Sequence, residues 1–326
     1  MIDFDNSCLI VGGGICGLTA ANILHQEKVP VVVVDKGRGI GGRLATRSIQ
    51  HPKGEGVFDY GAQFFTVSNP EFEADVTSWI NNGLVQKWPI DCFNDNQYRY
   101  RGRVSNRSIA KHLAANLSVF RSTRVKKILW KDHQWQATTT EKQTFSGQNL
   151  ILTPPVPQSL ELIEESGVDI PTNVRHTLQQ IQYSPCIAVL ALADSPNQIS
   201  PSGAIALPDH PIAWMACNHI KGISPNGYAV TIHASAEFSQ KYWEVENNEI
   251  LEKLLDEASS WLTGNILSAQ VHRWRYSQPI KPINIDFLAL EHQGRLLFAG
   301  DAFCQGDVEG AVLSGKRAAE YLLSKF

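Results

Sequence analysis

The chain has 326 residues, and its 29 lysines and arginines against 32 aspartates and glutamates give a formal net charge of −3 at pH 7. This balance argues against a basic nucleic-acid-binding surface, and the length predicts about two domains. No apolar run approaches the roughly 20 residues that cross a bilayer, and the acidic N-terminus is unlike a secretory signal. We therefore expect a cytoplasmic protein with no membrane span. The six cysteines and ten histidines show no metal-ligand spacing, which predicts reduced thiols and no metal site.

The start of the chain has the pattern of a β-α-β unit. Apolar strands are expected at 8–11 and 29–34, on either side of a helix over 15–26. The second strand is almost entirely valine, which is typical of a parallel strand covered on both faces. A loop rich in glycine and arginine follows at 37–47, and a helix is expected over 106–117. Strands are then expected at 125–140 and 150–152, before a proline-rich segment at 153–157 that ends sheet pairing.

The middle of the chain has a different texture, and the end returns to α/β. Strands are expected at 187–192, 203–207, 212–217, 228–234 and 269–274, with an amphipathic helix over 246–261. A strand at 296–300 and a helix over 309–324 end the chain. We predict an α/β fold in which a discontinuous Rossmann-type nucleotide-binding domain (1–85, 106–157 and 286–326) carries an inserted α+β substrate domain (86–105 and 158–285).

A glycine motif lies between the first strand and the first helix. Gly12, Gly14 and Gly17 fit the G-x-G-x-x-G pattern, in which glycines allow a tight turn, close approach of a pyrophosphate and close helix packing. An acid ends the second strand 18 residues after the last glycine, where it can accept hydrogen bonds from ribose hydroxyls. Strand, helix and acid in register make a chance glycine cluster improbable, although the motif alone does not choose between NAD and FAD. The residues assigned to this part of the site are Gly12, Gly14, Ile15, Cys16, Gly17, Asp35 and Lys36.

Two further motifs favour FAD. A Gly-Gly-Arg sequence (41–43) and the segment 59–65 follow the acid, and alone the first would be read as a flexible basic loop. Near the other end, Asp301 ends a strand where it can hold a ribityl hydroxyl, and a helix then begins with small residues. The positive end of that helix suits the N1–C2=O side of a flavin. The residues added to the cofactor site are Gly42, Arg43, Asp59, Tyr60, Gly61, Ala62, Gln63, Val125, Asp301, Val308, Glu309, Gly310 and Ala311.

The three motifs in this order resemble those of the FAD-dependent amine oxidase and desaturase superfamily. Segments 183–186, 213–216, 232–235, 271–276 and 308–311 resemble the bacterial renalase-like oxidoreductases in particular. This resemblance implies a split FAD domain of the para-hydroxybenzoate hydroxylase type. It also implies oxidation of the 1,2- and 1,6-dihydro isomers of NAD(P)H, with hydride transfer to flavin N5 and reoxidation by O2 to give H2O2. We expect the FAD to be bound non-covalently and Cys304 to remain a free thiol, because the renalase-like pattern requires no thioether.

The same resemblance points to a substrate pocket. His233 would orient the nicotinamide carboxamide, unless it is an ordinary core histidine, and Trp274 would form an aromatic wall over the isoalloxazine. Arg273 and Arg275 share one face of a strand, where they meet either substrate phosphates or solvent. The further pocket candidates are Tyr183, Trp214, Arg273, Arg275 and Tyr276.

Two alternatives stay open. In an amine oxidase, Trp214 and Trp274 would act as the aromatic pair that aligns an amine with N5. A non-catalytic flavin-binding sensor would bind the same reductants without turnover. No general base is required for hydride donation by a dihydronicotinamide, which agrees with the lack of a Ser/His/Asp or paired-carboxylate motif. The expected partners are a small-molecule substrate and O2; the oligomeric state is left open.

Overall fold

The computed structural model describes residues 6–93, 95–292 and 294–326. The chain forms two compact units: the first contains Met1–Gly42, Ala110–Gln182 and Pro279–Phe326, and the second contains Arg43–Ile109 and Tyr183–Gln278. This division differs from the predicted one, because residues 43–85 and 106–109 belong to the second unit and residues 158–182 and 279–285 to the first.

The first unit is built on a six-stranded sheet with the order β17-β18-β11-β1-β2-β7. Five of its strands are parallel, and β17 runs antiparallel to β18 at one edge. The strands are β1 (Cys8–Val11), β2 (Val31–Val34), β7 (Ser118–Phe120), β11 (Asn149–Leu152), β17 (Phe287–His292) and β18 (Gly294–Ala299). Both ends of the chain therefore contribute to one sheet, as predicted.

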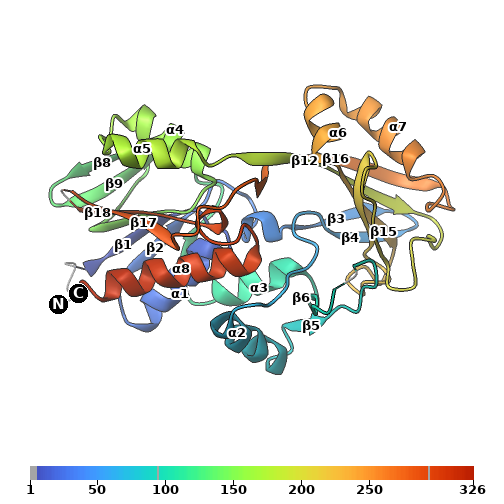
Figure 1. Ribbon diagram of the computed structural model, residues 1–326, viewed down its shortest axis with the longest axis horizontal. Coiled ribbons are helices and arrows are strands. Elements are labelled where there is room, and N and C mark those ends of the chain that lie inside the picture. The colour runs from blue at the N-terminus through green and yellow to red at the C-terminus, as the bar shows by residue number, and fades with distance from the viewer. Residues whose placement is uncertain (1–5, 94, 293) are drawn as a thin grey trace. The chain divides into compact units, whose positions relative to one another are not determined.

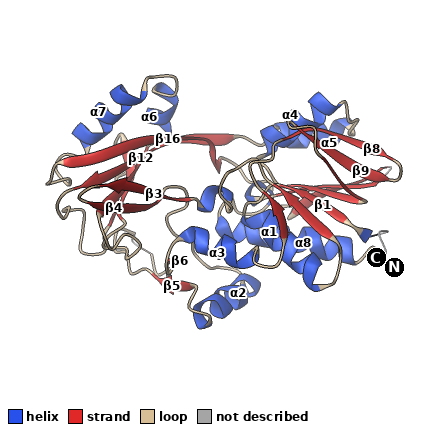
Figure 2. Cartoon of the chain, turned by 180° about the vertical axis from the view of Figure 1, so that it is seen from behind, coloured by secondary structure: helices blue, strands red, loops and turns tan. Residues whose placement is uncertain are grey.

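Helices α1 (Ile15–Gln26) and α8 (Val308–Leu323) lie side by side in this unit (Figures 1 and 2). They pack closely at Gly315, where a Cβ atom would lie 2.3 Å from the Cys16 carbonyl oxygen. This contact joins the helices that follow the first and the third cofactor motifs.

A second layer of the first unit contains three antiparallel strands, two of which lie in the predicted strand region 125–140, and two helices that the sequence analysis did not predict. The strands are β8 (Val125–Lys131), β9 (Gln134–Thr139) and β10 (Thr144–Gly147), and the helices are α4 (Val156–Ser166) and α5 (Thr172–Gln179). The prolines expected only to end sheet pairing instead open α4, with Pro155 at its N-cap and Pro157 in its first turn. A proline fits there because the first helical N–H groups have no intrahelical partner.

The second unit is built on a five-stranded sheet with the order β13-β14-β15-β12-β16. Its strands are β12 (Tyr183–Ala193), β13 (Ala204–Ala206), β14 (Ile212–Cys217), β15 (Tyr228–Ala234) and β16 (Ile266–Pro279). Helices α6 (Ala236–Lys241) and α7 (Asn247–Glu257) cover one face, over a core that includes Val230, Ile232 and Leu254.

The hairpin of β3 (Thr46–His51) and β4 (Gly54–Asp59) covers the opposite face of this sheet. Ile49 and Phe58 pack there against Ala188 and Leu190 of β12, which is why residues 43–85 belong to the second unit. The remaining elements are α2 (Pro70–Asn81), β5 (Val85–Lys87), β6 (Tyr100–Gly102) and α3 (Asn106–Leu113). The α/β fold with a Rossmann-type sheet and an inserted mixed domain is thus confirmed.

Candidate active site

The glycine motif of the first unit has the geometry that a dinucleotide pyrophosphate requires. Gly12 has φ +109°, and a Cβ atom there would lie 2.3 Å from the Thr153 hydroxyl; one on Gly17 would lie 2.1 Å from the Gly12 carbonyl oxygen. At Gly14, by contrast, a Cβ atom would have no neighbour within 4 Å. Gly14 is also the N-cap of α1 and offers no side-chain acceptor to the first helical N–H groups. Open space beside a helix N-terminus fits a bound phosphate.

The acid that ends β2 organises this loop. The Asp35 carboxylate accepts hydrogen bonds from the backbone N–H groups of Gly13 and Gly37. The Thr123 N–H donates to the Asp35 carbonyl oxygen at 2.9 Å, and Val125 follows two residues later at the start of β8. Asp35 is therefore linked to the glycine loop and, through Thr123, to the strand that carries Val125.

The second cofactor motif contacts the first. The Gly41 N–H donates to the Gly13 carbonyl oxygen at 2.9 Å, and a Cβ atom on Gly42 would lie 3.3 Å from the Gly14 Cα. Lys36, in contrast, extends to Gln158, where its Nζ donates to Oε1 at 2.8 Å.

The third motif is arranged differently from what the sequence suggested. Asp301 is buried after β18, and Gly300 has no atom within 4 Å of a Cβ position, so the backbone is open there. The Asp307 side chain, which the sequence analysis missed, caps α8 by accepting from the Gly310 N–H at 2.7 Å, and the Asp307 carbonyl accepts from the Ala311 N–H at 3.0 Å. These two N–H groups are therefore not available to a flavin ring edge, which corrects their predicted role.

Within the second unit, the two predicted catalytic residues share one hydrogen-bond acceptor. The Tyr60 carbonyl oxygen accepts from Trp274 Nε1 at 2.8 Å and pairs with His233 Nε2 at 3.1 Å. Because a carbonyl can only accept, His233 carries its proton on Nε2. Burial lowers the pKa of His233 from 6.5 to about 4, so the ring is neutral at pH 7.

An aromatic cluster of Tyr60, His272 and Trp274 surrounds this acceptor, and Arg47 lies beside it. Trp274 stacks on the Tyr60 ring with centroids 5.3 Å apart and planes at 25°. His272 meets both rings edge-on, at 4.9 Å from Tyr60 and 4.4 Å from Trp274, and the Arg47 guanidinium lies 5.1 Å from the Tyr60 centroid. Burial, with the charge of Arg47, lowers the pKa of His272 to about 4. The sequence analysis missed His272, although strand alternation places it on the face of Trp274.

Arg273 and Arg275 share a face of β16, as predicted. That face is opposite to the one that carries His272 and Trp274. Arg273 Nε donates to the Trp243 carbonyl at 2.9 Å, and its Nη atoms donate to the Asn247 side chain at 2.6 Å and to the Val245 carbonyl. The Arg275 guanidinium lies 5.2 Å from the Trp243 ring. Both arginines therefore contact the connection between α6 and α7, away from the aromatic cluster.

Two of the remaining candidates meet each other at the end of β16. Tyr183 contacts Tyr276 edge-on at 5.7 Å, and the Arg43 guanidinium lies 5.9 Å from the Tyr183 centroid. Arg43 Nη1 also donates to the Ser277 carbonyl at 2.9 Å. Arg43, expected in the cofactor site, is thus bound to the pocket candidates of the same unit.

Trp214 belongs to a separate aromatic core. It stacks on Phe93 at 5.8 Å and also contacts Phe64 and Trp88, and it is 8% exposed. Trp214 and Trp274 are therefore members of two different clusters, and no aromatic contact joins them among the residues that the structure describes.

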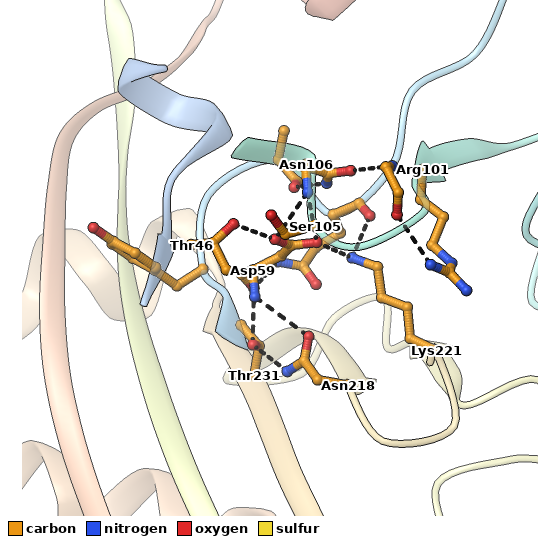
Figure 3. Close-up of polar contacts among 12 residues, drawn as sticks. Thr46, Asp59, Arg101, Ser105, Asn106, Asn218, Lys221 and Thr231 are labelled. Carbon is orange, nitrogen blue, oxygen red and sulfur yellow. Dashed lines mark hydrogen bonds and ion pairs between the residues drawn. The ribbon is translucent and has the colours of Figure 1, made fainter. Parts of the chain in front are cut away.

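The side chain of Asp59, also expected at the cofactor, is fully buried within a polar network (Figure 3). Its carboxylate accepts from the Thr46 hydroxyl at 2.6 Å, the Asn106 N–H at 3.1 Å and the Lys221 ammonium at 3.0 Å. Lys221 is 1% exposed, and burial lowers its pKa while Asp59 opposes that shift. The carboxylate is therefore bound by the protein's own groups, and Asp59 holds this network together.

The same network fixes the backbone of residues 59–63. Lys221 Nζ donates to the Gln63 carbonyl at 2.7 Å, and Asn106 Nδ2 donates to the Ala62 carbonyl at 2.6 Å. A Cβ atom on Gly61 would lie 1.9 Å from the Arg43 carbonyl oxygen, so only glycine fits. Tyr60, whose carbonyl binds His233 and Trp274, lies inside this fixed segment.

Comparison with known proteins defines the class. Residues 88–323 match the family described as flavin containing amine oxidoreductase, and residues 10–99 match the NAD(P)-binding Rossmann-like domain. The chain belongs to the flavin containing amine oxidoreductase family and is a flavin-dependent oxidoreductase.

Within this family the chain is renalase-like. It is 24% identical to renalase of Mus musculus over 94% of this chain and 95% of that protein. Its fold is similar to that of a putrescine oxidase variant, with a TM-score of 0.70 and 14% identity over 98% of this chain and 99% of the other. A structure assigned as a protoporphyrinogen oxidase of Exiguobacterium sp. 255-15 gives a TM-score of 0.69 at 12% identity, with the same coverage of both chains.

Two further observations concern only residues 6–93, 95–292 and 294–326. These residues include no group of three or more His, Cys, Asp or Glu side chains placed to hold a metal ion. None of the helices in these ranges is both long and apolar enough to span a bilayer.

Proposed function

We propose that this protein is a renalase-type flavoprotein oxidase in the cytoplasm. It oxidises 1,2- or 1,6-dihydro isomers of NAD(P)H to NAD(P)+. The substrate gives a hydride to N5 of FAD; the hydride, one proton and O2 then yield H2O2. A bound FAD supplies hydride acceptance and the reaction with O2.

The observation that carries this proposal is the set of uncharged rings in the second unit, Tyr60 and Trp274 with their two neighbouring histidines. Tyr60 and Trp274 offer stacking surfaces, and both neighbouring histidines are neutral at pH 7 because their pKa values are lowered to about 4. A dihydronicotinamide needs stacking and orientation to give up a hydride, and it has no proton to lose to a base. Trp274 would form the wall over the reacting ring, and the Tyr60 carbonyl fixes its orientation.

The residues of the first unit support FAD as the cofactor. The open Gly14 position at the start of α1 fits the pyrophosphate, Asp35 fits the adenosine ribose and buried Asp301 fits the ribityl chain. The further cofactor contacts proposed are Gly12, Ile15, Cys16, Gly17, Gly42, Arg43, Tyr60, Gly61, Ala62, Gln63, Val125, Val308 and Glu309.

We further propose that the FAD is not covalently attached. The thiol next to the third cofactor motif in the sequence is that of Cys304, which donates to Asp286 Oδ1 at 3.7 Å. Burial and Asp286 raise the pKa of Cys304 to about 12, and a protonated thiol is a poor nucleophile. Acid precipitation should leave a yellow supernatant over a colourless pellet; a yellow pellet would show a covalent bond.

An amine oxidase is the second candidate, favoured by the family match. Trp214 and Trp274, the pair expected to align the amine, lie in different hydrophobic clusters, each with its own aromatic neighbours.

Anaerobic stopped-flow spectroscopy tests these readings, by following flavin bleaching near about 450 nm. The 1,2- or 1,6-dihydro isomer should reduce the flavin rapidly, whereas 1,4-NADH should reduce it slowly. A pocket that places ring C2 or C6 over N5 holds C4 out of reach, and a misplacement of the reacting carbon by about 1 Å can lower the rate ~100-fold. Trp274→Ala should slow reduction far more than it weakens FAD binding, whereas Trp261→Ala is a tryptophan control in the same unit. Faster reduction by 1,4-NADH or by putrescine would overturn the proposal, and binding without bleaching would indicate a sensor.

A further inference from the structure

The structure places an unused histidine beside the proposed stacking residues. His272 lies edge-on to Tyr60 and Trp274, at 4.9 and 4.4 Å between ring centroids. Among the residues that the structure describes, neither of its ring nitrogens has a hydrogen-bond partner, although the ring is partly buried. A polar ring fixed by aromatic neighbours and without partners of its own is suited to bind a ligand.

His233, the residue that the sequence favoured for this role, is already engaged. Its Nε2 pairs with the Tyr60 carbonyl at 3.1 Å, as does Trp274 Nε1 at 2.8 Å. His233 therefore acts on the orientation of Tyr60 and, through the shared acceptor, on Trp274. It retains one acceptor nitrogen, whereas His272 retains both of its nitrogens.

We propose that His272 is the residue that binds the carboxamide of the dihydronicotinamide, which makes the site selective for amide-bearing rings. This inference rests on the proposed function. A neutral imidazole has one N–H donor and one acceptor nitrogen. A primary carboxamide offers the complementary pair, a carbonyl acceptor and an NH2 donor, so both nitrogens can be satisfied at once.

The neutral state of His272 follows from its surroundings. The charged group that faces it is Arg47, which lies over the Tyr60 ring and donates from Nη1 to Gln270 Oε1 at 3.1 Å. Burial and this positive charge lower the pKa of His272 to about 4, so the acceptor nitrogen is present at neutral pH.

The test pairs a change in the protein with a change in the substrate. The probes are a 1,6-dihydro isomer of NADH and the same isomer of its 3-acetylpyridine analogue, which keeps the carbonyl but lacks the NH2 donor. Anaerobic stopped-flow gives the apparent Kd and the limiting rate of flavin reduction for each probe. Wild-type protein should bind the amide more tightly by up to about tenfold, the size of one net hydrogen bond.

His272→Ala should remove this preference by weakening amide binding, with a smaller change in the limiting rate. His272→Asn keeps a donor and an acceptor and should restore part of the preference, which guards against a general folding defect. His219→Asn is the matched control, because that ring also packs edge-on to a tyrosine but is bound to the Ser224 carbonyl at 2.9 Å.

The outcomes separate the two proposals. If neither isomer reduces the wild-type flavin, the proposed function fails and this inference falls with it. If the wild type is reduced but His272→Ala and His272→Asn keep the full amide preference, the function stands and the role of His272 is wrong. Loss of the preference in His233→Asn but not in His272→Ala would return the carboxamide to His233.

Discussion

A single carboxylate, that of Asp35, connects the glycine loop to the turn after β2. It accepts from the N–H groups of Gly13 and Gly37, and charge-assisted hydrogen bonds of this kind contribute about 1.5–3 kcal/mol. Asp35→Ala removes them together with the proposed acceptor for the adenosine ribose. We expect FAD to dissociate about tenfold more readily or worse, since 1.4 kcal/mol corresponds to roughly a factor of ten.

Flavin fluorescence after serial dilution measures this change. Lys36→Ala is a suitable control, because it alters charge at the next residue while Lys36 itself is bound to Gln158. Equal FAD retention by Asp35→Ala and wild type would show that Asp35 contributes nothing to cofactor binding.

The two neutral histidines make stability depend on pH in a defined direction. Their folded-state pKa values are about 4, below the ordinary value of 6.5. Between these values the unfolded chain binds protons that the folded protein does not, so the free energy of unfolding falls as the pH falls from 6.5 towards 4. Above pH 6.5 both states are neutral, and these histidines contribute no slope.

Urea denaturation at several pH values between 4 and 7.5 checks this expectation. The double variant His233→Asn and His272→Asn should have a flatter profile between pH 6.5 and 4, whatever its stability at pH 7. An unchanged slope would mean that neither ring is kept neutral by the fold.

At the scale of residues, the sequence revealed the local constraints and missed the long-range ones. Gly17 follows from the motif because its nearest steric neighbour, the Gly12 carbonyl oxygen, lies within the fingerprint, whereas the close contact of Gly12 is with Thr153 after β11. The buried network of Asp59 was missed, since its partner Lys221 comes from a distant turn. Strand alternation showed that Arg273 and Arg275 share a face, but no pattern in β16 shows which face α6 and α7 cover.

Among the elements, the turn after β14 is attached to the segment 59–63 through Lys221. Lys221→Met leaves the Asp59 carboxylate buried without its cation, and breaking a buried pair costs about 3–5 kcal/mol. We expect the free energy of unfolding to drop by that amount, and flavin reduction to slow because the Tyr60 carbonyl is no longer held in place.

Chemical denaturation measures this loss, and Lys253→Met provides the comparison. Lys253 pairs with Glu249 at 3.5 Å on the surface of α7, and such a pair contributes about 0–1 kcal/mol. Adding Asp59→Asn to Lys221→Met should recover part of the stability. A loss for Lys221→Met no larger than for Lys253→Met would contradict the role of the buried pair.

Element prediction succeeded where periodicity was strong. The β-α-β start, α8 and the strands of the second unit all lie close to their expected ranges. Helix α4 was missed because prolines in the 153–157 segment were taken as breakers only, whereas two of them open α4; α5 was missed as well. The β3–β4 hairpin was missed because its short strands alternate weakly in hydrophobicity.

For the whole molecule, the two-ended sheet was predictable but the unit boundaries were not. The glycine motif and the last strand and helix identified one domain built from both chain ends. Assignment of residues 43–85 and 158–182 depended on which surfaces they bury, and only tertiary packing decides that: Ile49 and Phe58 pack on β12, and α4 packs on β8.

Flavin binding should stabilise the whole molecule by mass action. A ligand that binds only the folded state at 100 times its Kd adds about 2.7 kcal/mol, or on the order of 4 °C in Tm for a chain of this size. Differential scanning fluorimetry of flavin-stripped protein should show Tm rising with added FAD and levelling off only slowly at high concentration. FMN at the same concentrations should raise Tm far less, because it lacks the pyrophosphate–adenosine half that the open Gly14 position and Asp35 are suited to bind. In Asp35→Ala the FAD curve should shift to higher concentration by about tenfold. If FMN and FAD stabilised the protein equally, the glycine motif would not be the anchor of the cofactor.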